Sequence, residues 1–93
     1  MAEKDKKKIA VLVRERTGEG LRMALGLTLF DDSVDVYLIG VAPGGSGQDR
    51  MNIEMLQAMK AGLYSLCEAG GFTRVKEEAV PERLLDYDVV IAY

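Results

Sequence analysis

The run Ile9-Ala10-Val11-Leu12-Val13 decides the fold. It is short, continuous and apolar, and charged residues bound it on both sides: Lys8 and Arg14. Such a run predicts a strand buried on both faces, as in parallel sheets that helices cover above and below. Two further runs are of the same kind: residues 34–39, which alternate at first, and residues 89–93. These three runs are therefore predicted to be buried strands of a parallel sheet.

Residues with helical spacing separate these strands. The first set predicts an amphipathic helix over residues 18–30: Leu21, Ala24, Leu25, Thr28 and Leu29. A second helix is predicted over residues 50–69, with one apolar stripe: Ile53, Leu56, Met59, Leu63, Leu66 and Cys67. Gly70-Gly71 supplies its C-terminal stop. Gly62, inside this predicted helix, costs about 1 kcal/mol relative to alanine, which indicates a close packing contact.

Two shorter segments complete the order. Residues 72–76 alternate apolar with polar and predict a strand at or near a sheet edge. Residues 81–86 are long enough for only about one turn of helix. Strands alternating with helices imply a parallel sheet with helices on both faces. We therefore predict an α/β fold, a three-layer α/β/α sandwich with a mainly parallel sheet of about four strands. It forms a single domain over residues 1–93, in which residues 1–7 are a charged lead-in.

Composition excludes several classes of protein. With 48% apolar residues among 93, the chain is too rich in aliphatic side chains to be intrinsically disordered. Its apolar runs fall far short of the roughly 20 residues that span a bilayer, and the N-terminus has no signal-peptide pattern. We therefore expect a cytoplasmic protein with no membrane partner. A net charge of −3 argues against nucleic acid as a partner.

Residue usage also narrows the chemistry. The chain has no histidine and one cysteine, so it lacks the usual general base and cannot form an internal disulfide or a thiolate cluster. We expect no metal and no cofactor, and we assign no catalytic residue. Cys67 falls on the apolar stripe of the second predicted helix, near its C-terminus and beside Glu68. That position favours core packing over catalysis.

Three loops are expected beyond the carboxyl ends of the strands, where parallel sheets bind ligands: residues 14–20, 40–47 and 76–78. The two loops that contain glycine are the candidate ligand site. The candidate ligand-binding residues are Arg14, Arg16, Thr17, Gly18, Gly44, Gly45 and Ser46. Backbone N–H groups of such loops can approach an anion. Neither loop has the spacing of a dinucleotide-binding or phosphate-binding motif, and Glu15 and Glu19 repel anions. The alternative is that Thr17 caps a helix and the glycines make turns.

Four segments carry a resemblance to a known family: residues 7–13, 19–32, 34–40 and 84–93. Taken in this order, the chain resembles the DsrE/DsrF-like family of small sulfur-relay proteins. Its last segment resembles the DsrF and TusC branch. The resemblance implies an α/β/α fold and assembly into trimers or hexamers. It also implies, for active subunits, a persulfide on a cysteine that follows the third strand and begins a further helix.

The stretch that corresponds to that cysteine position is residues 76–80, and it contains no cysteine. Cys67 precedes the predicted edge strand and does not match the motif. We therefore expect a protein that lacks the persulfide cysteine and serves as an oligomeric scaffold or partner subunit in intracellular sulfur transfer. Its partners would be further copies of itself or related subunits. Two alternatives stay open: an anion- or nucleotide-binding module at the glycine loops, and a sulfurtransferase using Cys67.

Overall fold

The computed structural model describes residues 7–15, 17–29, 33–39, 47–67 and 72–92. The strands are β1 (Lys8–Val13), β2 (Ser33–Leu38), β3 (Gly62–Ser65), β4 (Thr73–Arg74) and β5 (Val89–Ala92). The helices are α1 (Thr17–Thr28), α2 (Gly47–Ala58), the 3₁₀ turn η1 (Glu77–Ala79) and α3 (Val80–Leu84). None of the helices in the described residues has the length and apolar character that crossing a bilayer requires.

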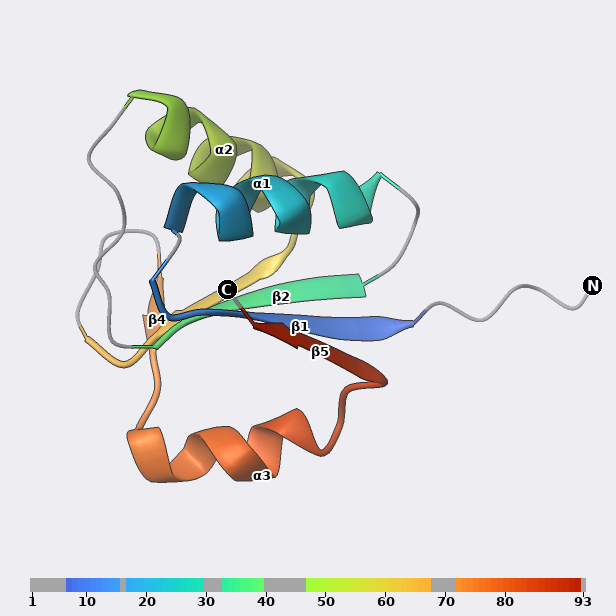
Figure 1. The fold of residues 1–93 in the computed structure, drawn as a ribbon, viewed down its shortest axis with the longest axis vertical. Coiled ribbons are helices and arrows are strands. Elements are labelled where there is room, and N and C mark those ends of the chain that lie inside the picture. Colours follow the sequence, from blue (N-terminus) through green and yellow to red (C-terminus); the bar gives the residue numbers. More distant parts are fainter. Residues whose placement is uncertain (1–6, 16, 30–32, 40–46, 68–71, 93) are drawn as a thin grey trace, which may run out of the picture.

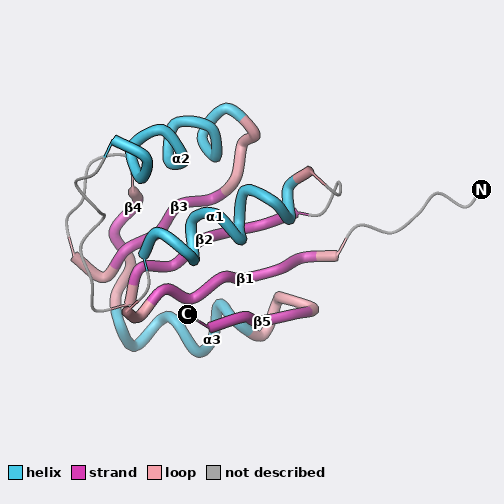
Figure 2. Tube along the Cα trace, turned by 45° about the horizontal axis from the view of Figure 1, so that its top comes forward, coloured by secondary structure: helices cyan, strands magenta, loops and turns pink. Residues whose placement is uncertain are grey.

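The strands form one parallel sheet in the order β4-β3-β2-β1-β5. Helices α1 and α2 lie on one face of this sheet and α3 lies on the other (Figures 1 and 2). The predicted three-layer α/β/α sandwich is therefore confirmed, with five strands where about four were expected. The segment predicted as an edge strand is β4, which does lie at one edge.

The core lies between the sheet and the α1–α2 layer. Alternate residues of β1, β2 and β3 point into it and meet α1 and α2, because successive side chains of a strand point to opposite faces. The fully or almost fully buried apolar members are Ile9, Val11, Val13, Leu21, Ala24, Val34, Val36, Leu38, Leu56 and Leu63. The run that decides the fold thus supplies one wall of this core, as its composition predicted.

The second predicted helix is wrong in its C-terminal half. Helix α2 begins at Gly47 and ends at Ala58, and the chain then enters β3 in place of continuing as helix to residue 69. The break is at Lys60, whose φ of 64° is left-handed backbone and ends a helix. As a result Leu66 and Cys67 lie beyond the end of a strand, and Cys67 is exposed, not packed in the core.

Gly62 makes the close contact that its position suggested, but as the first residue of β3. Its N–H donates to Asp35 Oδ1 of β2 at 3.0 Å. A Cβ placed on Gly62 would lie 2.5 Å from that same oxygen and 2.8 Å from Cε2 of Tyr64. Only a residue without a side chain therefore allows β3 to approach Asp35 this closely.

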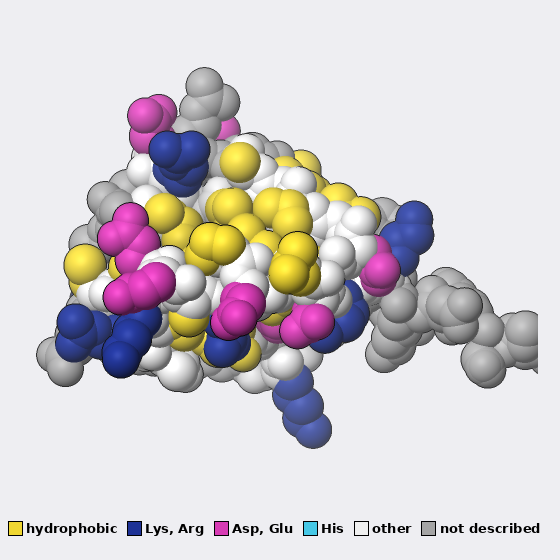
Figure 3. Space-filling model, turned by 90° about the horizontal axis from the view of Figure 1, so that it is seen from below, with side chains coloured by type: hydrophobic (Ala, Val, Ile, Leu, Met, Phe, Trp, Pro, Cys, Tyr) yellow, Lys and Arg dark blue, Asp and Glu magenta, His cyan; other side chains and the backbone are white. Residues whose placement is uncertain are grey.

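The run at residues 89–93 was expected to be buried on both faces, and this is wrong for β5. It is an edge strand whose Val89 and Ile91 pack on the core, while Val90 is 44% exposed on the α3 side. Figure 3 views the molecule from that side and shows apolar side chains in the middle with charged side chains around them. The short α3 is too small to cover this face as α1 and α2 cover the other.

Candidate functional site

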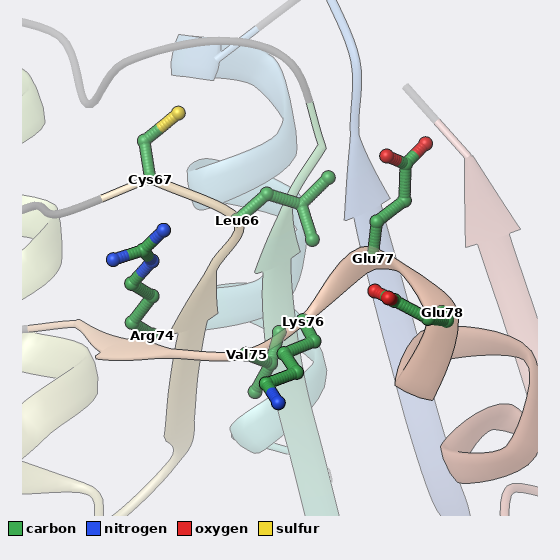
Figure 4. A pocket seen from close by; sticks show the side chains of 7 residues that line it. All are labelled: Leu66, Cys67, Arg74, Val75, Lys76, Glu77 and Glu78. Carbon is green, nitrogen blue, oxygen red and sulfur yellow. The ribbon is translucent and has the colours of Figure 1, made fainter.

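A hollow of about 770 Å³ lies at the carboxyl ends of β3 and β4, where parallel sheets bind their ligands. Seven described residues line it: Leu66, Cys67, Arg74, Val75, Lys76, Glu77 and Glu78 (Figure 4). They come from the segment that follows β3, from β4, from the connection between β4 and η1, and from η1 itself. Segments separated in sequence by the stretch at residues 68–71 are thus brought to one place by the pairing of β3 with β4.

Backbone pairing holds Cys67 at this edge. Leu66 N–H donates to the carbonyl of Leu38 at 3.2 Å, which fixes the exit of β3 against β2. Cys67 N–H then donates to Oγ of Ser65 at 3.2 Å, and Ser65 is itself only 1% exposed. A buried hydroxyl therefore fixes the backbone from which the thiol projects into solvent.

Charge is distributed unevenly around the hollow. Arg74 is paired with Ser65 across the β3–β4 ladder, and its guanidinium lies on the Cys67 side (Figure 4). Glu77 and Glu78 lie on the opposite side. The hollow therefore combines an exposed thiol, a cation on the same side and a separate acidic wall.

The predicted glycine-loop site is only partly within the described residues. Arg16, Gly44, Gly45 and Ser46 lie outside them, and Thr17 begins α1. Gly18 lies in the first turn of α1, where an added Cβ would be 3.3 Å from Oδ1 of Asp49. A carboxylate thus stands beside the helix N-terminus at which an anion was expected, and it opposes anion binding there.

Arg14 is exposed after β1. Neither Arg14 nor Gly18 is among the described residues that line the hollow. The described members of the predicted ligand set therefore do not lie in the Cys67 hollow.

A second cluster of polar side chains lies on the α3 face of the sheet. Arg83 Nε donates to the Tyr37 hydroxyl at 3.1 Å, and the Tyr37 and Tyr87 hydroxyls are 3.0 Å apart. Tyr87 donates its only hydroxyl hydrogen to Asp35 Oδ2, so Tyr37 must donate to Tyr87. The hydrogen bonds therefore run in one direction, from the Arg83 guanidinium to the Asp35 carboxylate. The second oxygen of this carboxylate, Oδ1, accepts from Gly62 N–H.

Aromatic contacts surround this chain. The rings of Tyr37 and Tyr64 stack with centroids 4.9 Å apart, and the Arg83 guanidinium lies 4.5 Å from the Tyr64 centroid. Burial, followed by the hydrogen bonds to Asp35 and Tyr37, raises the pKa of Tyr87 above that of an ordinary tyrosine. A hollow of about 240 Å³ is lined by this cluster together with Lys8 and Asp86.

The two clusters differ in what their polar groups do. In the tyrosine cluster, formed by Asp35, Tyr37, Tyr64, Arg83 and Tyr87, the Tyr37 and Tyr87 hydroxyls and the Asp35 carboxylate hydrogen-bond to one another. Among the described residues, every buried side-chain nitrogen and oxygen has a hydrogen-bond partner. This cluster therefore joins α3 to the sheet. The Cys67 hollow instead presents its thiol to solvent, so it is the better candidate for chemistry. Within the described ranges, no three His, Cys, Asp or Glu side chains are grouped so as to hold a metal ion.

The loop at residues 76–78, expected at the carboxyl edge of the sheet, does line the Cys67 hollow. The sequence predictions missed Cys67 as part of this hollow, and they missed the cluster around Asp35. Cys67 falls on a predicted helix because its apolar neighbours have helical spacing.

Asp35 is the polar residue in the alternating part of the strand predicted at residues 34–39. The available signal was the position of Asp35 between Val34 and Val36, in a strand predicted to be buried on both faces. A carboxylate in such a strand needs hydrogen-bond donors from neighbouring elements.

Comparison with known proteins identifies no family for this chain. No protein-family model, no curated protein and no solved structure matches this chain.

Proposed function

We propose that this protein carries sulfur on Cys67, as a persulfide, within an intracellular sulfur-transfer reaction. The observation that carries the proposal is the position of Cys67, exposed directly after the third strand of a parallel sheet and lining a hollow with Arg74. The proposal keeps the expected link to sulfur transfer and alters the expected role of this cysteine.

The expected absence of a sulfur-carrying cysteine rested on the location of the third strand. That strand was placed at residues 72–76, whereas β3 is Gly62–Ser65 and residues 76–80 follow the fourth strand. The DsrE/DsrF-like resemblance implies a persulfide cysteine that follows the third strand and begins a further helix. Cys67 follows the third strand, whereas the next described element after it is the strand β4 and not a helix. The resemblance therefore supports the proposal only in the position of Cys67 after the third strand.

The chemistry needs no outside oxidant. The Cys67 thiol gives its proton to solvent, and the thiolate attacks the sulfane sulfur of a persulfide or polysulfide donor. A sulfur–sulfur bond forms to Cys67 as the donor's own sulfur–sulfur bond breaks. A persulfide donor leaves as a thiolate, and an inorganic polysulfide leaves as a polysulfide anion that is shorter by the transferred sulfur. Delivery is the same exchange in reverse, because an acceptor thiolate attacks the outer sulfur and Cys67 leaves as the thiolate.

Arg74 has a defined part in this proposal. Its guanidinium lies on the Cys67 side of the hollow, where its positive charge attracts an anionic persulfide or polysulfide donor toward the thiol. Glu77 and Glu78 form the opposite wall, where they disfavour small anionic reagents approaching from that side. Assembly into an oligomer or with related subunits stays a prediction that accompanies this function.

Loading with inorganic polysulfide tests the proposal. The reduced full-length protein is expected to gain the mass of one sulfur atom, and Cys67→Ser is expected to gain none. Since any exposed thiol reacts slowly, the deciding measurement is rate: loading should be faster in the folded protein than in urea. Arg74→Gln should slow loading severalfold, whereas Arg22→Gln, which removes an exposed cation on α1, should leave the rate unchanged.

Equal rates in the folded and unfolded chain would show that the hollow gives Cys67 no special reactivity, and would overturn the proposal. An Arg74→Gln rate equal to that of the parent would remove the assigned role of Arg74. Mass spectrometry of the intact protein follows both reactions directly.

A further inference from the structure

The charged side chains that line the Cys67 hollow are divided between its two sides. Arg74 and Lys76 are basic, Glu77 and Glu78 are acidic, and all four are exposed. Figure 4 shows the Arg74 guanidinium on the Cys67 side, the two carboxylates on the other side, and the Lys76 ammonium pointing away from both. The hollow therefore has a positive side next to the thiol and a negative side opposite it.

These opposite charges do not neutralise one another. No side-chain hydrogen bond or ion pair joins Arg74, Glu77 or Glu78 to another described residue. The partly buried side chain of Leu66 lies between the two sides (Figure 4). The guanidinium and the carboxylates thus remain available to a ligand, with an apolar surface between them.

Backbone hydrogen bonds hold the two sides in place. Val75 N–H donates to the Ser65 carbonyl at 2.9 Å, which fixes the chain directly after Arg74. Ala79 N–H donates to the Lys76 carbonyl at 3.0 Å and closes the turn η1. Because the backbone is already ordered, a ligand that binds both sides need not order it on binding.

The size of the hollow fits a ligand larger than a polysulfide ion. Its volume of about 770 Å³ lies within the range of about 300–1,000 Å³ that is typical of small-molecule sites, whereas a polysulfide ion has only a few atoms. A ligand that complements both sides has a negative group at one end, a positive group at the other and apolar atoms between them. An amino acid or a short peptide has a carboxylate and an ammonium in such an arrangement.

We propose that the sulfur donor for Cys67 is a zwitterionic organic persulfide, R–S–SH, in which R is an amino acid or a short peptide. Arg74 binds its carboxylate, and Glu77 and Glu78 bind its ammonium. This inference rests on the function proposed above and adds the chemical class of the donor. The Cys67 thiolate attacks the outer sulfur of R–S–SH, so that the persulfide Cys67–S–SH forms and R–S⁻ leaves.

Loading rates with four donors test the two charges one at a time. Cysteine persulfide has both the ammonium and the carboxylate, N-acetylcysteine persulfide has only the carboxylate, cysteamine persulfide has only the ammonium, and inorganic polysulfide has neither group. For each donor, the rate with the folded protein is divided by the rate with the urea-unfolded protein, which removes differences in the intrinsic reactivity of the donors. This ratio should be highest for cysteine persulfide, because each favourable pair of exposed charges contributes about two- to fivefold.

Variants assign each charge of the donor to its partner in the hollow. Glu77→Gln combined with Glu78→Gln should lower the ratio about two- to fivefold for cysteine persulfide and should not lower it for N-acetylcysteine persulfide. Arg74→Gln should lower the ratio for both of these donors and should not lower it for cysteamine persulfide. Glu82→Gln removes an exposed carboxylate on α3 that is not among the described residues lining the hollow, so it should leave every ratio unchanged.

The outcomes separate this inference from the function on which it rests. Ratios that exceed one but are equal for the four donors would overturn the zwitterionic donor and leave sulfur loading on Cys67 in place. An equal effect of the double glutamate variant on cysteine persulfide and N-acetylcysteine persulfide, or no effect on either, would do the same. Ratios of one for all four donors would overturn the proposed function itself. Circular dichroism of each variant confirms that the compared proteins are folded.

Discussion

The two faces of the sheet are held to their helices by different kinds of interaction. On the α1–α2 face, apolar side chains such as Val11, Leu21 and Leu56 are completely buried. On the α3 face, a chain of hydrogen bonds links Arg83 through two tyrosines to Asp35. The first face depends on area removed from water, and the second depends on the positions of individual donors and acceptors.

This difference follows from the size of the covering layer. Helices α1 and α2 have 12 residues each, whereas α3 has five. A five-residue helix cannot bury enough apolar surface to hold itself against a sheet. Directional bonds from Arg83 and Tyr87, one within α3 and one just after it, take over that task. The stability that comes from the α1–α2 face should therefore be insensitive to changes of charge and pH. The stability that comes from the α3 face should depend on both.

The largest expected effect is on the apolar face. Leu56→Ala should lower the free energy of unfolding by about 2–5 kcal/mol, because it leaves a cavity between α2 and the sheet. Urea denaturation measures this loss. Leu85→Ala is the matched control on the α3 side: Leu85 is 82% exposed, and its loss should change stability by less than about 0.5 kcal/mol. A similar loss in both variants would contradict the proposed asymmetry.

A smaller effect is expected where the α3 face is held together. Asp35→Asn keeps the size of the side chain but turns one acceptor oxygen into a donor that faces Gly62 N–H or the Tyr87 hydroxyl. The cost should be about 1–3 kcal/mol in urea denaturation, because one donor loses its partner. Asp88→Asn removes the same charge from an exposed bond to Lys8 N and should have little effect. Equal stability of Asp35→Asn and the parent would exclude this role.

The smallest effect at neutral pH, and the clearest dependence on pH, belongs to Tyr87. Tyr87→Phe should cost about 0.5–1.5 kcal/mol at neutral pH through loss of its hydrogen bonds. The folded state raises the pKa of Tyr87, so it holds this proton more tightly than the unfolded chain does. Its stabilisation is therefore fully present below the ordinary tyrosine pKa of about 10 and is lost as the pH rises above it.

Urea denaturation between about pH 9 and about pH 11 measures this dependence. The parent should lose stability with a slope that exceeds that of Tyr87→Phe by up to about 1.4 kcal/mol per pH unit, the value for one proton. Parallel curves for the two proteins would show that the Tyr87 proton is not coupled to folding.

Much of the sheet could be predicted because its strands have unambiguous patterns. Residues 9–13 and 34–39 are continuous or alternating β-branched runs bounded by turns, and both are strands within one residue of the expected ends. The strand β3 escaped prediction because Leu56, Met59 and Leu63 keep helical spacing across the point where the chain changes structure. Short apolar segments fit either period, and only pairing with a neighbouring strand decides between them.

The sequence by itself determined the layers of this protein, because the order of apolar runs and amphipathic segments permits few arrangements other than a covered parallel sheet. Tertiary structure decided where the chemistry lies. Because Gly62–Ser65 pairs with β2 as a strand, Cys67 lies at the carboxyl edge of the sheet and not on the predicted helix. There it lines the same hollow as Arg74. The packing of the segment around α3 against the sheet also brings Tyr87 to Asp35, 52 residues away in the sequence. Contacts between residues so distant in sequence leave no periodic pattern, so they appear only when the chain is folded.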